Sequence, residues 1–161
     1  MLVRAADEGD VTAVAGLNAV VQRLHQDARP DWFVAPDVEA ITAWVRTTLD
    51  RDDAFVFVAT EDAEDDDGRV VGYVLATLHR RPATPFTRPL TVLELDQIGV
   101  DPDARRHGAA TLLITRVADL GTELGVDTVL LTVWDFNETA RAVFRARGFV
   151  DAMHRMELTR T

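Results

Sequence analysis

The sequence predicts one mixed α/β domain spanning residues 1–161, with a central sheet and helices packed on both faces. Segments of strand-like and helix-like pattern follow one another in the order β-α-α-β-β-β-α-β-α-β. An acidic turn that ends in Asp67-Gly68 joins two apolar runs, which is typical of a β-hairpin. Segment 90–134 has the pattern strand, helix, strand, so its two strands should be parallel with a right-handed crossover.

The N-terminal half is expected to contain a short strand, two helices and the hairpin. Residues 3–6 predict the first strand. Asp10 should cap a helix that ends near residue 27, before Pro30, and Asp37 should cap a second helix over 38–49. Apolar residues recur at helical spacing in both segments. The β-rich runs 54–60 and 69–79 predict the two strands of the hairpin, with residues 61–68 as its turn.

The C-terminal half should add three strands and two helices. Residues 90–100 predict a strand, 108–125 a helix that ends at Gly125, and 127–134 a strand buried on both faces. Asn137 should cap a helix over 138–148, and 149–159 should form the last strand. With its hairpins, the sheet is expected to be mixed and mostly antiparallel.

The composition excludes several classes of chemistry. The chain has no cysteine, serine or lysine, and all 17 basic residues are arginine. Disulfides, thiol or serine nucleophiles, Schiff bases and a Walker-type lysine are therefore excluded. The four histidines show no metal-ligand spacing, so no metal is expected. Arginine in place of lysine, with many Ala, Val and Asp, is typical of a GC-rich bacterial genome.

The net charge of −10 bears on partners and location. It opposes binding to nucleic acid, whose phosphates require a basic face. It favours cationic small molecules or amines through long-range attraction, or it only keeps the protein soluble. No apolar run is long enough to cross a bilayer, and the N-terminus lacks the pattern of a signal peptide. We expect a cytoplasmic protein that does not bind membranes.

The stretch DPDARRHGAATLL, residues 101–113, predicts an anion site at the start of a helix. A helix start carries unpaired N–H groups and the positive end of the helix dipole, and phosphate can satisfy both. Small residues allow a close approach, and the basic side chains add charge. The residues concerned are Arg105, Arg106, His107, Gly108, Ala109, Ala110 and Thr111. The alternative is a helix start that only packs tightly onto the sheet.

Two motifs extend this prediction. Arg105-x-x-Gly108-x-Ala110 resembles the acetyl-CoA-binding signature Q/R-x-x-G-x-G/A of the GNAT N-acetyltransferases. Asn137-x-x-Ala140, followed by Phe144, Gly148 and Phe149, is similar to the family pattern N-x-x-A-x-x-x-Y-x-x-x-G-F, with Phe144 in place of tyrosine. The order of elements also matches. The resemblance implies the GNAT fold, with a sheet of about six or seven strands, and acetyl-CoA as co-substrate.

The resemblance also implies how the coenzyme binds. The strands at 90–100 and 127–134 should separate at a bulge, which leaves backbone groups of Ile98, Gly99 and Val100 free to pair with the pantetheine arm. Gly99 is consistent with that bulge, or it only marks a lack of room for a side chain. Asn137 and Ala140 should lie beside the coenzyme, although Asn137 alternatively only caps its helix.

Glu94 and Asp96 are the candidate catalytic residues. They alternate on strand 90–100, so both should point to the same face. Glu94 stands eleven residues before Arg105, the spacing of the glutamate base in the histone acetyltransferase branch. The resemblance therefore assigns Glu94 as the base and Asp96 as the group that orients it or binds the amine. The alternative for each is an ion pair with arginine.

The general acid and the acceptor pocket are less well defined. Family members often use a tyrosine at the position of Phe144, which here should pack on the pantetheine or sit in the core. Water, Tyr73 or His79 could protonate the thiolate instead. The acceptor pocket is expected to include His25, Trp32, Phe33, Tyr73 and Trp134, although each of these could be an ordinary core or surface residue.

The sequence therefore predicts an acetyl-CoA-dependent N-acetyltransferase that acts on a small-molecule or protein amine by direct transfer. The alternative is a non-catalytic CoA-binding or regulatory domain on the same fold. A different nucleotide-binding module is disfavoured by the missing phosphate-loop lysine and by the second motif. A homodimer is compatible with the family, but no exposed apolar stripe requires one.

Overall fold

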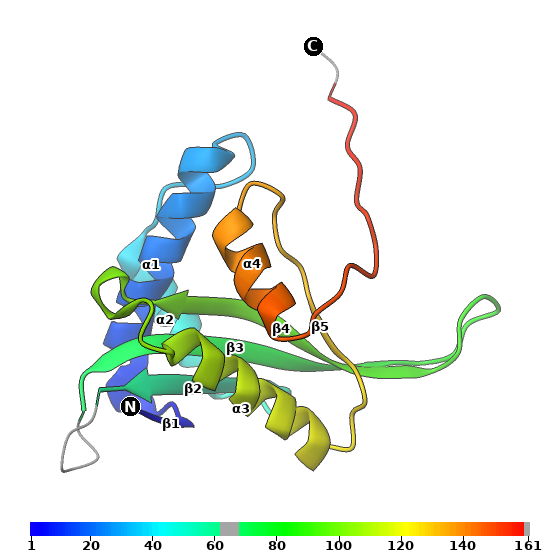
Figure 1. The fold of residues 1–161 in the computed structure, drawn as a ribbon, viewed down its shortest axis with the longest axis horizontal. Coiled ribbons are helices and arrows are strands. Elements are labelled where there is room, and N and C mark those ends of the chain that lie inside the picture. The colour runs from blue at the N-terminus through cyan, green and yellow to red at the C-terminus, as the bar shows by residue number, and fades with distance from the viewer. Residues whose placement is uncertain (62–67, 160–161) are drawn as a thin grey trace.

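The computed structural model describes residues 1–61 and 68–159, in which one five-stranded sheet has the order β1-β2-β3-β4-β5. Figure 1 shows how the helices surround it. The strands are β1 (Leu2–Ala5), β2 (Ala54–Thr60), β3 (Val70–Arg81), β4 (Leu90–Val100) and β5 (Val129–Leu131). The helices are α1 (Val11–Ala28), α2 (Val38–Leu49), α3 (Ala109–Glu123) and α4 (Glu138–Ala146), with short 3₁₀ turns at Glu8–Asp10 and Pro102–Ala104.

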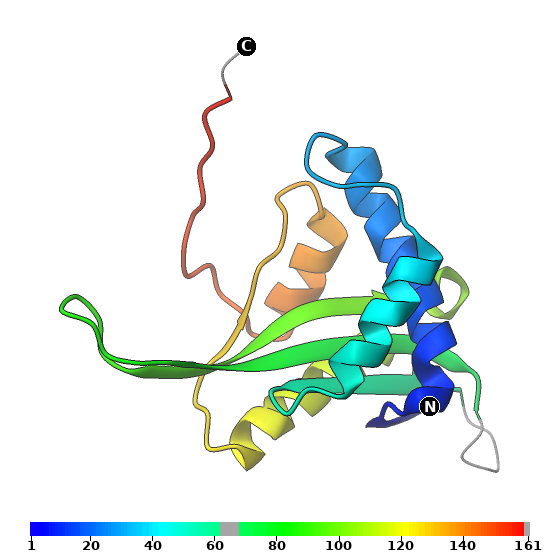
Figure 2. The ribbon, with the colours of Figure 1, turned by 180° about the vertical axis from the view of Figure 1, so that it is seen from behind.

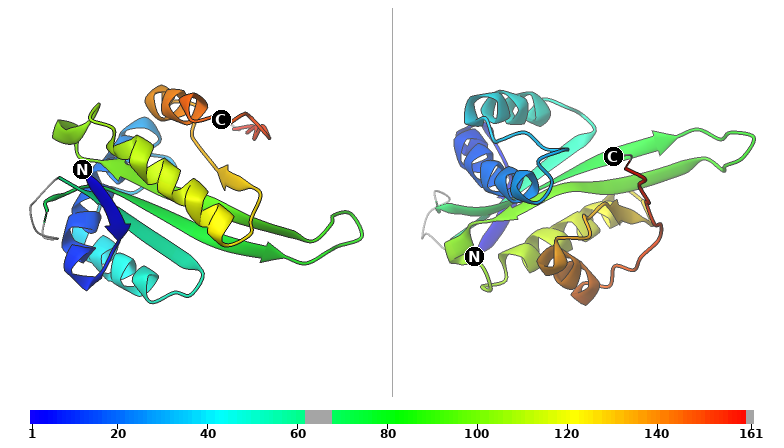
Figure 3. Two further views of the ribbon diagram at one scale, coloured as in Figure 1. Left: turned by 60° about the horizontal axis from the view of Figure 1, so that its bottom comes forward. Right: turned by 90° about the horizontal axis from the view of Figure 1, so that it is seen from above.

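The predicted mixed sheet is confirmed. Strands β1 to β4 pair antiparallel with their neighbours, and β4 pairs parallel with β5. Helices α1 and α2 cover one face, and α3 and α4 cover the other (Figure 3). The sheet is therefore the middle of three layers.

Each face of the sheet has its own core, and β3 contributes to both. Tyr73 packs in the core beneath α1 and α2, whereas its neighbour Val74 packs in the core beneath α3 and α4. Side chains of a strand alternate between faces, so a strand covered on both faces must be apolar at nearly every position. This explains the almost continuous apolar run of β3.

Two of the three predicted helix caps are confirmed. Asp37 accepts a hydrogen bond from the Ala40 amide, and Asn137 accepts one from the Ala140 amide. The prediction for Asp10 is wrong. It occupies the position before α1, but its carboxylate makes no cap bond there. It is buried and instead accepts two hydrogen bonds from Arg4, at 2.6 and 2.9 Å.

The prediction of six or seven strands is wrong for the described part of the chain. Segment 149–159 forms neither helix nor strand and leads away from the sheet beyond α4 (Figures 1 and 2). Strand β5 has three residues, fewer than the predicted 127–134, and it is half-buried rather than buried on both faces. A strand extends only as far as a neighbouring strand pairs with it, and in the described residues β5 pairs with β4 alone. This pairing covers three residues, so β5 is short.

The hairpin of β2 and β3 pairs as predicted, but residues 62–67 of its turn lie outside the described residues. None of the helices in residues 1–61 and 68–159 combines the length and the apolar character that crossing a membrane requires.

Candidate active site

The start of α3 is open and has no side-chain cap. Its N-cap residue, Gly108, has a left-handed backbone (φ 93°), and a Cβ placed there would have no neighbouring atom within 4 Å. Ala109, the next residue, packs into the core beneath α3. The helix start therefore combines a fixed position on the sheet with room for an anion beside its first amides.

Basic residues border this opening. Pro102, Asp103, Arg105, Arg106 and His107 line a pocket immediately before α3. Arg105, Arg106 and His107 are all exposed, and Arg106 has a left-handed backbone (φ 66°) that is uncommon outside glycine. Arg105 bends back so that its Nε donates to the carbonyl of Val100, at 3.4 Å. The positive charge of the turn thus lies between the end of β4 and the start of α3.

Strands β4 and β5 separate soon after they meet. They pair only from Leu93 with Val129 to Leu95 with Leu131. In the described part of the chain, residues 97–100 of β4 have a ladder partner on the β3 side alone. This stretch includes Ile98, Gly99 and Val100, whose backbone groups were predicted from the sequence to pair with the pantetheine arm.

The bulge in β4 lies at Asp96, not at Gly99. Leu75 of β3 pairs with Gln97, whereas the next residue, Ala76, pairs with Leu95. Asp96 is therefore the extra residue, at the point where β4 leaves β5. A Cβ at Gly99 would lie 2.7 Å from Cε1 of Tyr73, so Gly99 is needed because there is no room for a side chain.

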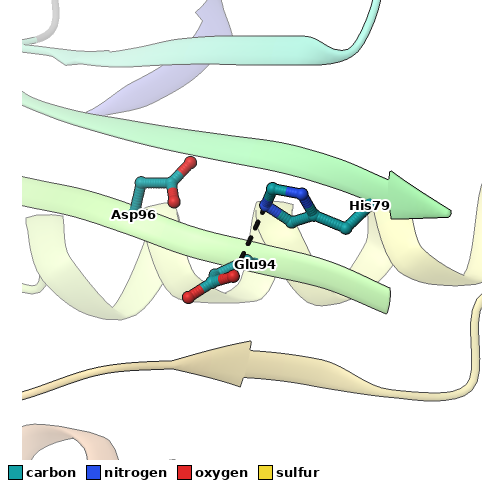
Figure 4. A group of neighbouring side chains, drawn as sticks. All are labelled: His79, Glu94 and Asp96. Atoms are coloured by element: carbon teal, nitrogen blue, oxygen red, sulfur yellow. Dashed lines mark ion pairs between the residues drawn. The ribbon is translucent and has the colours of Figure 1, made fainter. Parts of the chain in front are cut away.

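Glu94 and Asp96 point to the same face, and His79 of β3 joins them (Figure 4). One ligand atom from each of the three residues lies within 4.8 Å of the others. His79 Nε2 is 3.4 Å from a carboxylate oxygen of Glu94, and Thr77 donates a hydrogen bond to Asp96. The group lies on the α1 and α2 face of the sheet, next to the point where β4 and β5 separate.

The two carboxylates have different surroundings. Asp96 is exposed as a whole residue, but its carboxylate lies against β3. Burial of that carboxylate raises the pKa of Asp96, and the negative charge of Glu94 acts in the same direction. The hydrogen bond from Thr77 partly opposes this shift. Two neighbouring acids with unlike environments are suited to holding and releasing a proton.

The same three side chains could also bind a cation. The sequence predicted no metal because the histidines alone show no ligand spacing. Strand pairing brings one histidine of β3 next to two carboxylates of β4, an arrangement that spacing along the chain cannot indicate. Carboxylates beside a histidine are found both in proton transfer and in metal binding.

Four of the five residues predicted for the acceptor pocket meet in an aromatic cluster. The ring of Phe33 lies 5.0 Å from His25 and 5.4 Å from Trp134, and Trp32 lies 5.2 Å from Trp134. Phe136 stacks on Trp134 at 5.9 Å. The cluster joins α1, the link between α1 and α2, and the segment after β5.

Arg29 completes this cluster from the link. Its guanidinium lies 5.5 Å from the ring of Trp32 and 5.3 Å from the ring of Trp134. Asp31 accepts hydrogen bonds from Arg29 at 2.9 and 2.7 Å. Faces of tryptophan rings attract cations, so this cluster can hold a positively charged group.

Tyr73, the fifth predicted residue, lies elsewhere. It is 1% exposed beneath α1, where its hydroxyl accepts a hydrogen bond from Asn18 at 2.9 Å and donates to Gln97 at 3.2 Å. Burial raises the pKa of Tyr73 far above its usual value, against the effect of the Asn18 hydrogen bond. A hydroxyl in this position stabilises the core and is unsuited to donating a proton to a substrate.

A model of the acetyltransferase (GNAT) family matches residues 5–149. The chain belongs to the GNAT acetyltransferase family. No protein among the curated sequences matches it.

Solved structures share the GNAT fold with this chain. The BH1408 protein from Bacillus halodurans, solved as a tetramutant, has a TM-score of 0.86 at 24% identity, covering 99% of each chain. The aminoglycoside N-acetyltransferase AAC(6')-Iy, in complex with the bisubstrate analog CoA-S-monomethyl-acetylneamine, has a TM-score of 0.73 at 22% identity, covering 99% of this chain and 97% of that one. AAC(6')-IG from Acinetobacter haemolyticus, an aminoglycoside 6'-N-acetyltransferase, has a TM-score of 0.73 at 17% identity, covering 100% and 99%.

Residues of the second GNAT motif make contacts within the fold of this chain. Asn137 caps α4 through the Ala140 amide. Ala140 packs against the core beneath α3 and α4, and Phe144 is buried in that core, 5.7 Å from the ring of Phe149. The cap at Asn137 and the core position of Phe144 are therefore observed, and the expected coenzyme contacts of Asn137 and Ala140 stay predictions.

Sequence reasoning did not assign His79, Arg29 or Phe136 to a site, although it considered His79 as an acid. His79 stands far from Glu94 along the chain, and only the pairing of β3 with β4 reveals their contact. Arg29 and Phe136 flank predicted aromatic residues in the sequence. The signal available was their proximity to Trp32 and Trp134, since an arginine between tryptophans favours cation–π contacts.

Proposed function

We propose that this GNAT chain is an acetyl-CoA-dependent N-acetyltransferase, which moves an acetyl group directly to a primary amine of a small molecule or protein. One observation carries the proposal. The middle of β4 bears Glu94 and Asp96, close to the point where β5 separates from β4, and the C-terminal end of β4 leads to the open, basic start of α3. A single strand therefore connects an anion site with a proton-accepting site.

The pyrophosphate of the coenzyme would bind at the start of α3. The amides after Gly108 supply donors, and Arg105 and Arg106 supply charge. The pantetheine arm would run along the free side of β4, past Val100 and Ile98. Six residues of strand, at about 3.3 Å each, place Glu94 roughly 20 Å from Val100 along this path, a span that such an arm can cover.

The acceptor amine would approach from the α1 and α2 face. Glu94 and Asp96 lie on that face, and the Trp32–Trp134 cluster belongs to the elements around the same opening. Carboxylates and tryptophan rings both favour a cationic amine, as does the net charge of −10. The neighbours AAC(6')-Iy and AAC(6')-IG, named as aminoglycoside acetyltransferases, make polyamino sugars one class to test.

The reaction needs a neutral amine and an acceptor for the proton that it loses. The amine nitrogen attacks the thioester carbonyl carbon, so a C–N bond forms and the C–S bond breaks. Glu94 takes the proton from the nitrogen, directly or through water, with Asp96 orienting the amine. The thiolate takes a proton from water, because Phe144 has no proton to donate and the Tyr73 hydroxyl is buried in the core. A thiol pKa near 8.5 makes this leaving group acceptable without a protein acid.

The test is release of free thiol from acetyl-CoA across a panel of polyamines, aminoglycosides and peptide N-termini. We expect turnover with at least one amine, and we expect Glu94→Gln to lower kcat roughly 100-fold or more at neutral pH while leaving coenzyme affinity unchanged. The deficit should shrink at high pH, where the amine loses its proton unaided. Glu123→Gln, which breaks the ion pair with Arg116 on α3, is the matched control and should keep full activity.

Three results would contradict parts of this proposal. Coenzyme binding without turnover for any amine would favour the non-catalytic alternative. Full activity of Glu94→Gln at every pH would exclude Glu94 as the base. Turnover that disappears with a chelator and returns with a divalent metal would assign His79, Glu94 and Asp96 to metal binding instead.

A further inference from the structure

Strands β3 and β4 continue beyond the sheet as a two-stranded arm, residues 79–92. Figures 1 and 3 show this arm projecting from the body of the protein. The neighbouring strands stop at its base, because β2 pairs with β3 only as far as Thr77 and β5 pairs with β4 only from Leu93 onward. Within the described residues, the two strands of the arm therefore have only each other as ladder partners.

The tip of the arm is closed by its own turn. The backbone amides of Thr84 and Thr87 donate to each other's carbonyl oxygens at 3.0 and 3.4 Å, and the two hydroxyls are hydrogen-bonded at 2.8 Å. Pro82, Pro85 and Pro89 restrict the backbone around this turn. The arm is thus shaped before it meets a partner, which lowers the entropy lost on binding.

The arm is basic, although the protein is acidic. It contains Arg80, Arg81 and Arg88 and no acidic residue, whereas the whole chain has a net charge of −10. All three arginines are exposed, and no carboxylate of residues 1–61 and 68–159 pairs with them. Arg88 lies five residues from the base of the arm, roughly 15 Å at 3.3 Å per residue, and salt screens charges beyond about 8 Å. The arm therefore attracts an anionic partner independently of the acidic body.

Charged residues and prolines on an exposed strand also protect it from pairing with other chains. That role requires charge but not charge of one sign. Acidic side chains outnumber basic ones in this chain by 27 to 17, so protection alone would not select only arginine. The uniform positive charge points to an anionic partner.

One face of the arm continues the face that carries the candidate active site. Side chains alternate along a strand, so Arg81 lies on the same face of β3 as His79, and Arg80 lies on the opposite one. His79 is 3.4 Å from Glu94, which ties this face to the candidate base. Arg81 pairs with Leu90 of β4, four residues from Glu94. At 3.3 Å per residue, this separation along β4 is roughly 13 Å.

We propose that the arm binds an extended, acidic peptide segment of a protein acceptor along the face of Arg81, with the acceptor amine at Glu94. This inference rests on the proposed acetyl transfer and narrows its acceptor to an amine of a protein. In an extended peptide, the residue about four positions from an N-terminal amine would lie beside Arg81. The unpaired strand edges of the arm offer N–H and C=O groups to the same peptide. A small amine reaches Glu94 without these contacts.

The test compares two peptides with a free N-terminal amine, one with aspartate about four and five residues from the amine and one with asparagine there. Fluorescence anisotropy with coenzyme A present measures binding without turnover, and thiol release from acetyl-CoA measures kcat/KM. We expect the aspartate peptide to bind roughly 5-fold or more tightly at low salt. The preference should shrink as added salt screens the charges.

Two variants of neighbouring residues locate the contact. Arg81→Glu should abolish the preference for aspartate and should favour a third peptide that has arginine at the same positions. Arg80→Glu makes the same change of charge on the opposite face and, as the matched control, should keep the preference for aspartate. Both side chains are exposed, so circular dichroism and melting should match wild type. Turnover of a small amine should be equal in both variants and in wild type.

Three results would overturn the proposal. One is equal binding of the aspartate and asparagine peptides by wild type, and another is equal loss of the preference in Arg80→Glu and Arg81→Glu. The third is tighter binding to a DNA oligonucleotide or to phosphatidylserine vesicles than to the aspartate peptide; Phe86, 94% exposed at the tip, makes the vesicles a necessary comparison.

Failure of the arm and failure of acetyl transfer give different results. An aspartate preference in anisotropy that Arg81→Glu removes, without thiol release for any amine, would support peptide binding by the arm and refute acetyl transfer. Turnover of a small amine without any aspartate preference would support acetyl transfer and refute the role of the arm.

Discussion

Replacing Gly108 with glutamate tests whether the start of α3 holds the coenzyme. Gly108 has φ 93° and open space at its Cβ position, so the variant adds a carboxylate at the helix start where the anion is proposed to bind. Gly125, just beyond the other end of α3, has φ 67° and equally open space. Gly125→Glu is therefore a control with the same new charge and the same kind of backbone strain, at the opposite end of a 15-residue helix that is roughly 22 Å long.

The two variants should be similar in stability and different in binding. A left-handed backbone costs a non-glycine residue about 1–2 kcal/mol. For a domain of this size the melting temperature should then fall by about 2–8 °C in each variant. Binding changes only at Gly108, where a carboxylate about 6 Å from one phosphate charge, at an effective dielectric constant near 20, is repelled by roughly 3 kcal/mol. That is on the order of a 100-fold loss of affinity.

Calorimetric titration with acetyl-CoA measures this difference. We expect Gly108→Glu to bind at least roughly 100-fold more weakly than wild type, and Gly125→Glu to bind like wild type. If Gly108→Glu keeps wild-type affinity, or if both variants lose affinity equally, the coenzyme does not use this helix start.

Three further predictions concern stability. Asp10→Asn should lower the free energy of unfolding, measured in urea melts, by about 2–4 kcal/mol. Burial acts to raise the pKa of Asp10, but the hydrogen bonds from Arg4 hold this pKa below the usual 3.8. The difference in stability from wild type should therefore be complete above about pH 4 and should shrink as the pH falls through the folded-state pKa. Gly99→Ala should cost about 1–3 kcal/mol in the same assay, because its Cβ would lie 2.7 Å from the Tyr73 ring; a neutral result would show that the ring can shift freely. Tyr73→Phe should cost about 1 kcal/mol through the lost hydrogen bonds to Asn18 and Gln97 while kcat stays unchanged, and a large fall in kcat would restore Tyr73 as a candidate acid.

Local signals in the sequence were sufficient for most elements. The caps at Asp37 and Asn137 act within three residues, and the apolar pattern of 90–100 defines β4 with the observed bounds. The parallel pairing of β4 with β5 followed from the helix between them, because a crossover connection permits little else. Asp10 was misassigned because its residue type suits a cap, whereas its partner, Arg4, belongs to a neighbouring strand.

The candidate site depends on contacts between strands, which a one-dimensional pattern does not contain. The prediction that Glu94 and Asp96 share a face is confirmed, but it assumed a regular strand. The bulge at Asp96 adds one residue to β4, so the alternation of side chains shifts by one position after it. Before the bulge the even-numbered Glu94 faces α1, and after it the odd-numbered Gln97 and Gly99 do. Gly99 was assigned to the bulge because glycine is common there, although its actual constraint is the Tyr73 ring.

The misassigned last strand shows what periodicity can and cannot establish. The sequence predicts a strand over 149–159, but a strand forms only where a second backbone supplies hydrogen-bond partners. Asp151 and Glu157 bind α4 and the α1–α2 link, and no backbone among residues 1–61 and 68–159 forms a strand ladder with the segment. Strand-like residue types therefore do not suffice to predict a strand in 149–159, because whether a strand forms there depends on which segments lie beside it in the folded chain.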